Sequence, residues 1–345
     1  MVLSEKASQY TKMRHDINRH FYYGKCPFCR AEEECFIVND DSDTFICYFC
    51  GMKGTGSDFM AQSHYSDSDH SEEDSEALQI YEDATIFYSK NLFDNLNPGY
   101  TYLENTRAMS KTEMLRFGLG YAPNEYNALF KKLSRDHSED ALLRSGLFRK
   151  TDKGYINDFF RNRVMFPIKN DRGKVIAFGG RAILDDGPKY LNSPESSLFA
   201  KRTTLFGYPY HLENRHSELI VCEGYMDCIA LQNAGFNDSC AVLGTALTKE
   251  HADLIKKQYD RVILSLDSDK AGINAAKKSL HVLSEAGLSA KILQLDPAKD
   301  PDEFLQRFPK SQLQDRLIMA LPPECFLARN EDISALMSIL LMQIR

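Results

Sequence analysis

Leu219-Ile-Val-Cys-Glu-Gly-Tyr-Met-Asp227 decides the fold of this chain, together with Val262-Ile-Leu-Ser-Leu-Asp-Ser-Asp269. Each stretch begins as a short apolar run and ends in acidic residues, which is the pattern of a buried strand in a parallel sheet. The carboxyl ends of such strands form the edge where an α/β sheet binds its ligands. Carboxylate oxygens suit Mg²⁺ and Mn²⁺. The two stretches therefore predict a divalent-metal site built from Glu223, Asp267 and Asp269.

The sequence around these stretches alternates between strands and helices. Strands are expected at 219–222, 240–243, 261–266 and 290–295, and helices at 225–234, from Thr248 with support from Glu250, and at 271–286. This alternation indicates a parallel sheet covered by helices on both faces. Asp300 and Asp302, in Lys299-Asp-Pro-Asp-Glu303, follow the fourth strand and are further metal-ligand candidates. Helix starts and surface turns explain most single Asp-x-Asp motifs, but acidic residues at the ends of three separate strands are harder to dismiss.

The N-terminal region contains two cysteine pairs, Cys26-Pro-Phe-Cys29 and Cys47-Tyr-Phe-Cys50. With two residues between them, both thiolates of a pair can bind the same ion. The loop between the two pairs is long enough to fold back as a hairpin and bring the second pair to that ion. One structural Zn²⁺ bound by these four cysteines is expected, in a small zinc-ribbon β domain. Cys35 lies between the pairs and is left out of the ligand set, because a lone cysteine is more often a small buried apolar group.

Composition and charge narrow the class of protein. The 345 residues, 43% of them apolar, are enough for two or three domains. Since no long apolar run and no signal peptide appear, a cytoplasmic protein with no membrane partner is expected. The net charge of −7 argues against a uniformly basic nucleic-acid surface, yet residues 149–202 hold twelve Lys or Arg against six Asp or Glu. Residues 63–76 are strongly acidic and are expected to form a flexible linker.

The basic surplus coincides with a predicted β-hairpin and loop. Arg161-Asn-Arg-Val-Met-Phe-Pro-Ile168 predicts one strand, the turn 170–173 follows, and 175–178 predicts the second strand. Positive side chains on short glycine- and proline-broken loops suit a phosphate backbone, because they supply charge without reading sequence. The candidates for binding template or nucleotide are Arg161, Arg163, Arg181, Lys189 and Lys201. An ordinary solvated surface is the alternative for each of them.

Taken in order, these motifs resemble the DnaG-type primases of bacteria and phages. The resemblance spans residues 20–305 and rests on the cysteine pairs and on residues 117–123, 161–168, 178–181, 188–195, 223–227, 243–246, 267–272 and 299–303. The carboxylate motifs alone would indicate only a TOPRIM domain, which topoisomerases and some nucleases share. The arginine hairpin and the Pro-Lys-Tyr loop at Lys189 favour primase. Cys29 departs from the histidine that is usual in cellular members.

The resemblance implies a fold that is α/β (α+β overall) and five regions. These are a zinc-binding domain (1–62), the acidic linker (63–76), the N-terminal basic subdomain of an RNA polymerase domain (77–212), a TOPRIM catalytic subdomain with a parallel sheet (213–308) and a C-terminal helical segment (309–345).

The resemblance also implies an activity, the synthesis of short RNA primers on single-stranded DNA for replication. In this interpretation Glu223, Asp267, Asp269 and Asp300 hold two or more Mg²⁺ or Mn²⁺ ions, and the basic residues guide the template or bind ribonucleoside triphosphates. A replicative helicase is a further implied partner, although no helicase-binding domain is evident before Arg345. Two alternatives are a TOPRIM nuclease or topoisomerase-like enzyme, and a non-catalytic zinc/TOPRIM recombination mediator. The mediators are much shorter and do not need the Arg163 hairpin.

Overall fold

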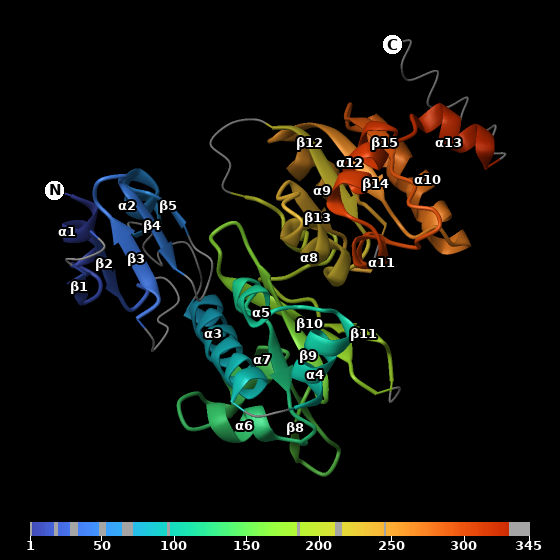
Figure 1. Cartoon of the computed structure of the whole chain (residues 1–345). Coiled ribbons are helices and arrows are strands. Elements are labelled where there is room, and N and C mark those ends of the chain that lie inside the picture. The colour runs from blue at the N-terminus through green and yellow to red at the C-terminus, as the bar shows by residue number, and fades with distance from the viewer. Residues whose placement is uncertain are drawn as a thin grey trace. The chain divides into compact units, whose positions relative to one another are not determined.

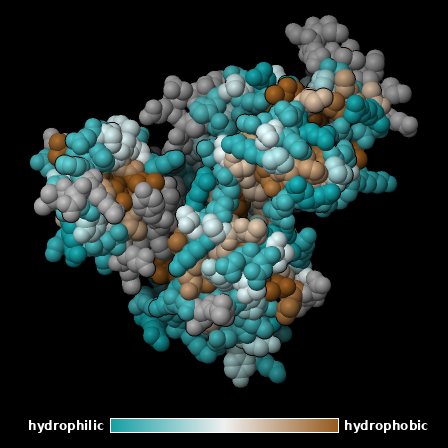
Figure 2. All heavy atoms as spheres, in the orientation of Figure 1, coloured by the Kyte–Doolittle hydropathy of each residue, from teal (hydrophilic) through white to brown (hydrophobic). Residues whose placement is uncertain are grey.

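The protein is represented by a computed structural model, which describes residues 2–16, 20–27, 34–47, 53–63, 72–94, 97–184, 187–210, 216–244 and 246–330. The chain divides into two units, Met1–Leu198 and Phe199–Arg345, coloured from blue to yellow-green and from yellow to red in Figure 1. None of the helices in the described ranges combines the length and hydrophobicity needed to cross a bilayer. In the view of Figure 2 the described surface is mostly hydrophilic, with hydrophobic residues in small separate patches.

The first unit begins with a small antiparallel sheet. Its elements are α1 (Leu3–Ala7), β1 (Met13–Asp16), β2 (Phe21–Gly24), β3 (Phe36–Asn39), β4 (Thr44–Cys47), β5 (Lys53–Thr55) and α2 (Gly56–Ser63), with the strands paired in sequence order. Phe36, Phe45 and Phe59 pack with ring centroids 5.5 to 6.2 Å apart and fill the centre of this region. The predicted β domain is confirmed, and these three rings serve its core.

The rest of the first unit is a mixed α+β region. Its helices are α3 (Glu72–Phe93), α4 (Pro98–Thr101), the π-helical turn η1 (Tyr102–Thr106), α5 (Lys111–Arg116), α6 (Ala128–Leu133) and α7 (Glu139–Arg144). Its strands are β6 (Gly120–Ala122), β7 (Phe148–Lys150), β8 (Ile156–Asp158), β9 (Arg163–Lys169), β10 (Val175–Ala182) and β11 (Tyr190–Asn192), and the main sheet has the order β11-β10-β9-β6. The predicted hairpin is confirmed, since β9 and β10 pair antiparallel. Tyr81 and Tyr88 of α3 pack on Phe178 of this sheet.

The acidic segment expected to be a flexible linker is partly helical. α3 begins at Glu72, five residues before the predicted helix start at residue 77. In its first turns, Asp74 accepts a hydrogen bond from the Ser197 hydroxyl at 2.6 Å, and Glu76 pairs with Arg144 at 3.2 Å. Acidic residues near a helix N-terminus are also favoured by the helix dipole. The linker prediction is therefore wrong for residues 72–76, and residues 64–71 lie outside the described residues.

The second unit is an α/β domain built on a four-stranded parallel sheet. Its strands are β12 (His216–Cys222), β13 (Ser239–Ala241), β14 (Tyr259–Ser265) and β15 (Ser289–Ile292), in the order β13-β12-β14-β15. Its helices are α8 (Tyr225–Asn233), α9 (Lys249–Lys256), α10 (Lys270–Glu285), α11 (Pro301–Arg307), α12 (Lys310–Ile318) and α13 (Pro323–Arg329). All three strand pairs are parallel, which confirms the predicted fold class.

Both faces of the parallel sheet are covered. Leu219 and Val262 point to one face and belong to a core that also contains residues of α9, α10 and α13. Ile220 and Ile263 point to the opposite face and are also buried. Burial on both faces explains why these strands are apolar without alternation. The predicted fourth strand, 290–295, is longer than β15 because its apolar run continues into a buried loop.

Candidate active site

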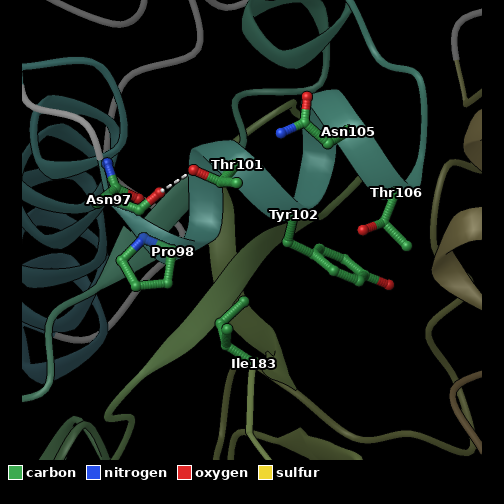
Figure 3. Close-up of a pocket in the computed structure, with 7 residues that line it drawn as sticks. All are labelled: Asn97, Pro98, Thr101, Tyr102, Asn105, Thr106 and Ile183. Atoms are coloured by element: carbon green, nitrogen blue, oxygen red, sulfur yellow. Dashed lines mark hydrogen bonds between the residues drawn. The ribbon is translucent and has the colours of Figure 1, made fainter.

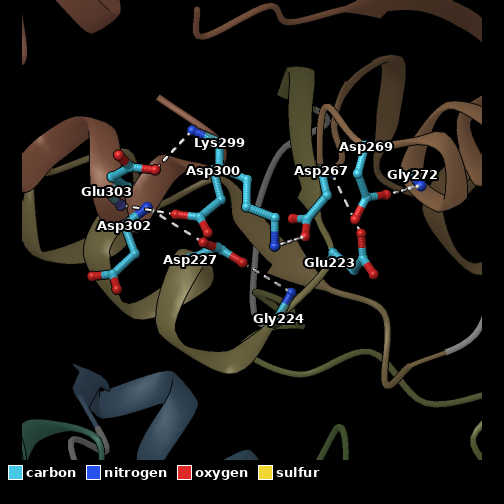
Figure 4. A network of polar contacts seen from close by, with 10 residues as sticks. All are labelled: Glu223, Gly224, Asp227, Asp267, Asp269, Gly272, Lys299, Asp300, Asp302 and Glu303. Atoms are coloured by element: carbon cyan, nitrogen blue, oxygen red, sulfur yellow. Dashed lines mark hydrogen bonds and ion pairs between the residues drawn. The ribbon is translucent and has the colours of Figure 1, made fainter. Parts of the chain in front are cut away.

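The predicted metal ligands lie together at the carboxyl edge of the parallel sheet. Glu223 directly follows β12, and Asp267 lies two residues after β14. Asp269 is the N-cap of α10, and Asp300 is the N-cap of α11. Figure 4 shows these side chains gathered in one polar network. The sheet edge thus brings together the four acidic residues that the sequence singled out.

Two of these carboxylates also cap helices. Asp269 accepts a hydrogen bond from the Gly272 backbone N–H at 2.9 Å, and Asp300 accepts one from the Glu303 backbone N–H at 2.8 Å. In each case Oδ1 makes the cap. A helix start and a ligand role are therefore compatible at these positions, because Oδ2 of each carboxylate is not used in the cap.

Glu223 and Asp267 are held close to each other. The Asp267 backbone N–H points at Glu223 Oε2 over 3.4 Å, a long contact. Burial raises the pKa of the Glu223 carboxyl above its ordinary value, and repulsion from Asp267 adds to that increase. A glutamate in this setting is a stronger base than a solvated one.

Asp227 is a member of this network that the sequence reasoning missed. Its Oδ2 accepts from the Gly224 N–H at 3.1 Å and its Oδ1 from the Asp302 N–H at 3.3 Å, so it joins the first turns of α8 and α11. Burial raises the pKa of Asp227 well above its usual range, and repulsion from Asp300 adds to the shift. Its position four residues after Glu223 in the opening stretch was the available signal.

Lys299 brings a positive charge into the cluster. Its Nζ lies 2.5 Å from Asp267 Oδ2. The hydrogen bond to Asp267 raises the pKa of the Lys299 ammonium. This contact was not foreseen, because it depends on how the loop before α11 meets the end of β14.

The donor chemistry of the cluster fits a hard divalent cation. Carboxylate oxygens come from several strand ends, and an ammonium group already compensates part of their charge. Within the described ranges, however, no three His, Cys, Asp or Glu side chains are arranged around a single point as a ready metal site. Metal binding by Glu223, Asp267, Asp269 and Asp300 therefore belongs to the proposal below.

Arg163 in the basic region is largely buried. Its Nη1 donates to the carbonyl oxygens of Gly180 at 3.1 Å and Pro188 at 2.9 Å. This guanidinium thereby ties β10 to the loop that carries Lys189, which is exposed. In this arrangement Arg163 positions the loop.

Two other predicted arginines stack on tyrosine rings. The Arg161 guanidinium lies 4.0 Å from the centroid of Tyr126. Arg181 Nε donates to the Tyr102 hydroxyl at 2.6 Å, and Arg107 Nε donates to the same hydroxyl at 2.6 Å. The sequence did not single out Arg107 or Tyr102, since their meeting depends on how η1 packs beside β10.

Tyr102 faces a hollow in the surface of the first unit. The cavity measures about 510 Å³ and is lined by Asn97, Pro98, Thr101, Tyr102, Asn105, Thr106 and Ile183 (Figure 3). Its walls come from α4, η1 and the residue after β10. π-Helical turns are rare and occur often at functional sites. Lys201, the remaining basic candidate, is half-buried in the second unit.

The predicted zinc site is described in part. Cys26 and Cys47 are buried, whereas Cys29 and Cys50 lie outside the described residues. Cys35 Sγ lies 3.6 Å from Cys47 Sγ. Two thiolates on one tetrahedral zinc ion are separated by about 3.8 Å. The spacing of buried Cys47 and half-buried Cys35 fits two thiolates on one zinc ion, and it places Cys35 beside the predicted ligand set.

Family models match three successive regions that together cover most of the chain. Family models match residues 3–85 ("CHC2 zinc finger"), 87–211 ("DNA primase catalytic core, N-terminal domain") and 220–305 ("Toprim-like"). A solved catalytic domain of DnaG primase bound to single-stranded DNA has a TM-score of 0.68 and 33% identity, covering 75% of this chain and 85% of that one. The chain belongs to the DnaG primase family. The zinc-binding and RNA polymerase domains of Aquifex aeolicus primase give a TM-score of 0.77 at 28% identity, covering 99% of this chain and 90% of that one.

Curated DNA primases are similar in sequence to most of this chain. The DNA primase of Clostridium acetobutylicum is 35% identical over 312 residues, covering 83% of this chain and 52% of the relative. The DNA primase of Escherichia coli K12 is 30% identical over 339 residues, covering 89% of this chain and 58% of the relative. The chain thus spans about half the length of the curated DNA primases it matches.

Proposed function

We propose that this protein is a DNA primase, a nucleotidyltransferase that joins ribonucleoside triphosphates into short RNA primers on a single-stranded DNA template. The observation that carries the proposal is the gathering of Glu223, Asp267, Asp269 and Asp300 at one edge of a parallel sheet, in a chain of the DnaG family. A catalytic domain of this family has been solved with single-stranded DNA, which supports the choice of template.

The acidic cluster is proposed to hold the metal ions of the reaction. Two or more Mg²⁺ or Mn²⁺ ions, when bound, would align a 3′-hydroxyl with the α-phosphate and neutralise the departing pyrophosphate. Asp267 and Asp269 would contribute oxygens from the segment between β14 and α10, and Asp300 would contribute its Oδ2. Glu223, with its raised pKa, is suited to accept the proton of the attacking hydroxyl.

The remaining regions are proposed to serve the nucleic acid and the nucleotide. Arg161, Arg181, Lys189 and Lys201 bind template phosphates or the triphosphate, and Arg163 holds the Lys189 loop in place. The zinc-binding domain (1–62), with one structural Zn²⁺, helps to select the start site. The basic subdomain (77–212), the TOPRIM subdomain (213–308) and the helical segment (309–345) complete the proposed organisation.

Primer synthesis is the direct test. We expect the full chain, incubated with single-stranded DNA, Mg²⁺ or Mn²⁺ and labelled ribonucleotides, to produce short RNA. Glu223→Gln and Asp269→Asn should each lower the yield by about a hundredfold or more, because each removes a charged ligand. Asp253→Asn, at an exposed position of α9, is the matched control and should retain wild-type yield.

Four outcomes would contradict the proposal. If no RNA forms, or if both carboxylate variants work as well as the wild type, the assigned centre is wrong. Cleavage or relaxation of a supercoiled plasmid under the same metals would instead indicate a nuclease or topoisomerase. Binding of DNA without consumption of nucleotide would indicate a recombination mediator.

A further inference from the structure

Lys299 is held at the acidic cluster by contacts that residues around it make. Its backbone N–H donates to Glu303 Oε2 at 2.9 Å, directly before the N-cap of α11. Glu303 is engaged further, because its Oε1 pairs with Arg307 at 2.7 Å. Glu303 is therefore already paired, and the Lys299 side chain extends across to Asp267.

The two partners of this ion pair differ in their exposure. The Asp267 side chain is 18% exposed, whereas that of Lys299 is 50% exposed. A cavity of about 140 Å³, lined by both residues and by Ser268 and Asp296, adjoins them. That volume holds several water molecules. The ammonium can thus leave Asp267 and become hydrated again, while the carboxylate stays where it is.

We propose that Lys299 is the resident counter-cation of the acidic cluster and competes with the divalent metal ion for Asp267. The inference rests on the proposed function only in that the same carboxylates bind the metal. A dication and an ammonium at Asp267 Oδ2 repel each other, so binding of one disfavours the other. Metal entry therefore displaces Lys299, and this lysine raises the metal concentration at which the site fills.

The test is a Mn²⁺ titration of the purified full chain, followed by the EPR signal of free Mn²⁺, with no DNA or nucleotide present. Lys299→Met keeps the apolar stem but removes the charge, and should tighten Mn²⁺ binding by about threefold to fivefold, the upper part of the range expected for loss of a half-exposed ion pair. Lys299→Arg keeps the charge and should stay within about twofold of the wild type. Lys278→Met, exposed on α10, controls for net charge and should leave the affinity unchanged.

The titration separates this inference from the primase proposal. Unchanged or weaker Mn²⁺ binding in Lys299→Met overturns it, and so does the absence of Mn²⁺ binding in both wild type and variant. If Lys299→Arg behaves like Lys299→Met, positive charge is not the cause. In a chain that makes primers, Lys299→Met should also lower the Mg²⁺ concentration that gives half-maximal synthesis. A chain that makes no primers fails the proposed function and leaves the titration result standing.

Discussion

Gly272 shows how one residue shapes the acidic cluster. A Cβ at this position would overlap the backbone carbonyl of Asp267, and the Gly272 N–H donates to the Asp269 carboxylate at 2.9 Å. The loop from Asp267 to Asp269 therefore folds directly over the first turn of α10, which only glycine permits. The spacing of Asp267, Asp269 and Gly272 has a steric reason.

Gly272→Ala should separate the two aspartates. The added methyl group meets backbone, which cannot move aside as a side chain can, so we expect a loss of about 1–3 kcal/mol of stability. Mn²⁺ affinity should fall with it, as measured by the same EPR titration. Gly154→Ala, at φ +83° in a turn with no atom near the added methyl, is the control for backbone strain alone. It should leave metal binding intact, and equal metal binding in both variants would contradict the steric account.

The candidate ligands could be predicted from the sequence, whereas their partners could not. Glu223 and Asp267 directly follow apolar runs, and Asp269 and Asp300 lie a few residues further on, so their place at a sheet edge follows from the strand pattern alone. Asp227 and Lys299 join the cluster through contacts across 75 and 32 residues of chain, counted to Asp302 and Asp267. Such contacts depend on which loops meet, and no local pattern encodes that. The ligand roles themselves remain predictions.

The start of α9 shows, at the scale of an element, which contacts the sequence predicts and which it does not. Thr248 caps the helix as predicted, but its reciprocal partner is His251 and not Glu250. His251 accepts from the Thr248 N–H at 3.3 Å through Nδ1, so its Nε2 carries the proton that is donated to the Thr204 carbonyl at 3.2 Å. This buried imidazole thereby fastens α9 to the segment that contains Lys201.

Acid should destabilise the start of α9, because protonation of His251 at Nδ1 removes the acceptor of the Thr248 N–H. Burial lowers the pKa of His251 below its ordinary value of 6.5. Between the lowered pKa and 6.5 the unfolded chain binds more protons than the folded one, so stability rises with pH there and is lost as the pH falls. We expect His251→Gln, which cannot titrate, to show a smaller loss of stability between pH 7 and pH 5 in denaturant unfolding. His281→Gln, at an exposed position of α10, is the matched control. The same loss in wild type and His251→Gln would rule out this role.

At the scale of the whole molecule, the two units differ in how well the sequence predicts them. The parallel sheet of the second unit could be predicted because its strands lie in apolar runs that alternate with helices. In the first unit, β6, β7, β8 and β11 have only three residues each, which is too short for a period of two to be visible. The hairpin of β9 and β10 was predicted because it is longer and has a clear turn. The start of α3 was missed because acidic composition resembles that of a linker.

Loss of zinc should impair the initiation of primers more than their extension. Cys47→Ser should release Zn²⁺, measured by metal analysis, and should impair initiation more than extension of a supplied primer, since the zinc-binding domain is proposed to select the start site. Cys325→Ser, at an exposed cysteine of the second unit, should keep zinc and both activities. Equal losses in initiation and extension would argue that zinc only supports folding.

The buried carboxyl of Asp227 also limits how the cluster can move. It accepts hydrogen bonds from the starts of both α8 and α11, where no water can replace a lost donor. Rotating one helix away from the other would leave a buried polar group unsatisfied, so Glu223 and Asp300 behave as parts of a single rigid frame. If the proposed reaction takes place here, space for an incoming nucleotide would have to come from side chains that can change rotamer, of which half-exposed Lys299 is one, while the frame would hold the reacting groups at fixed positions.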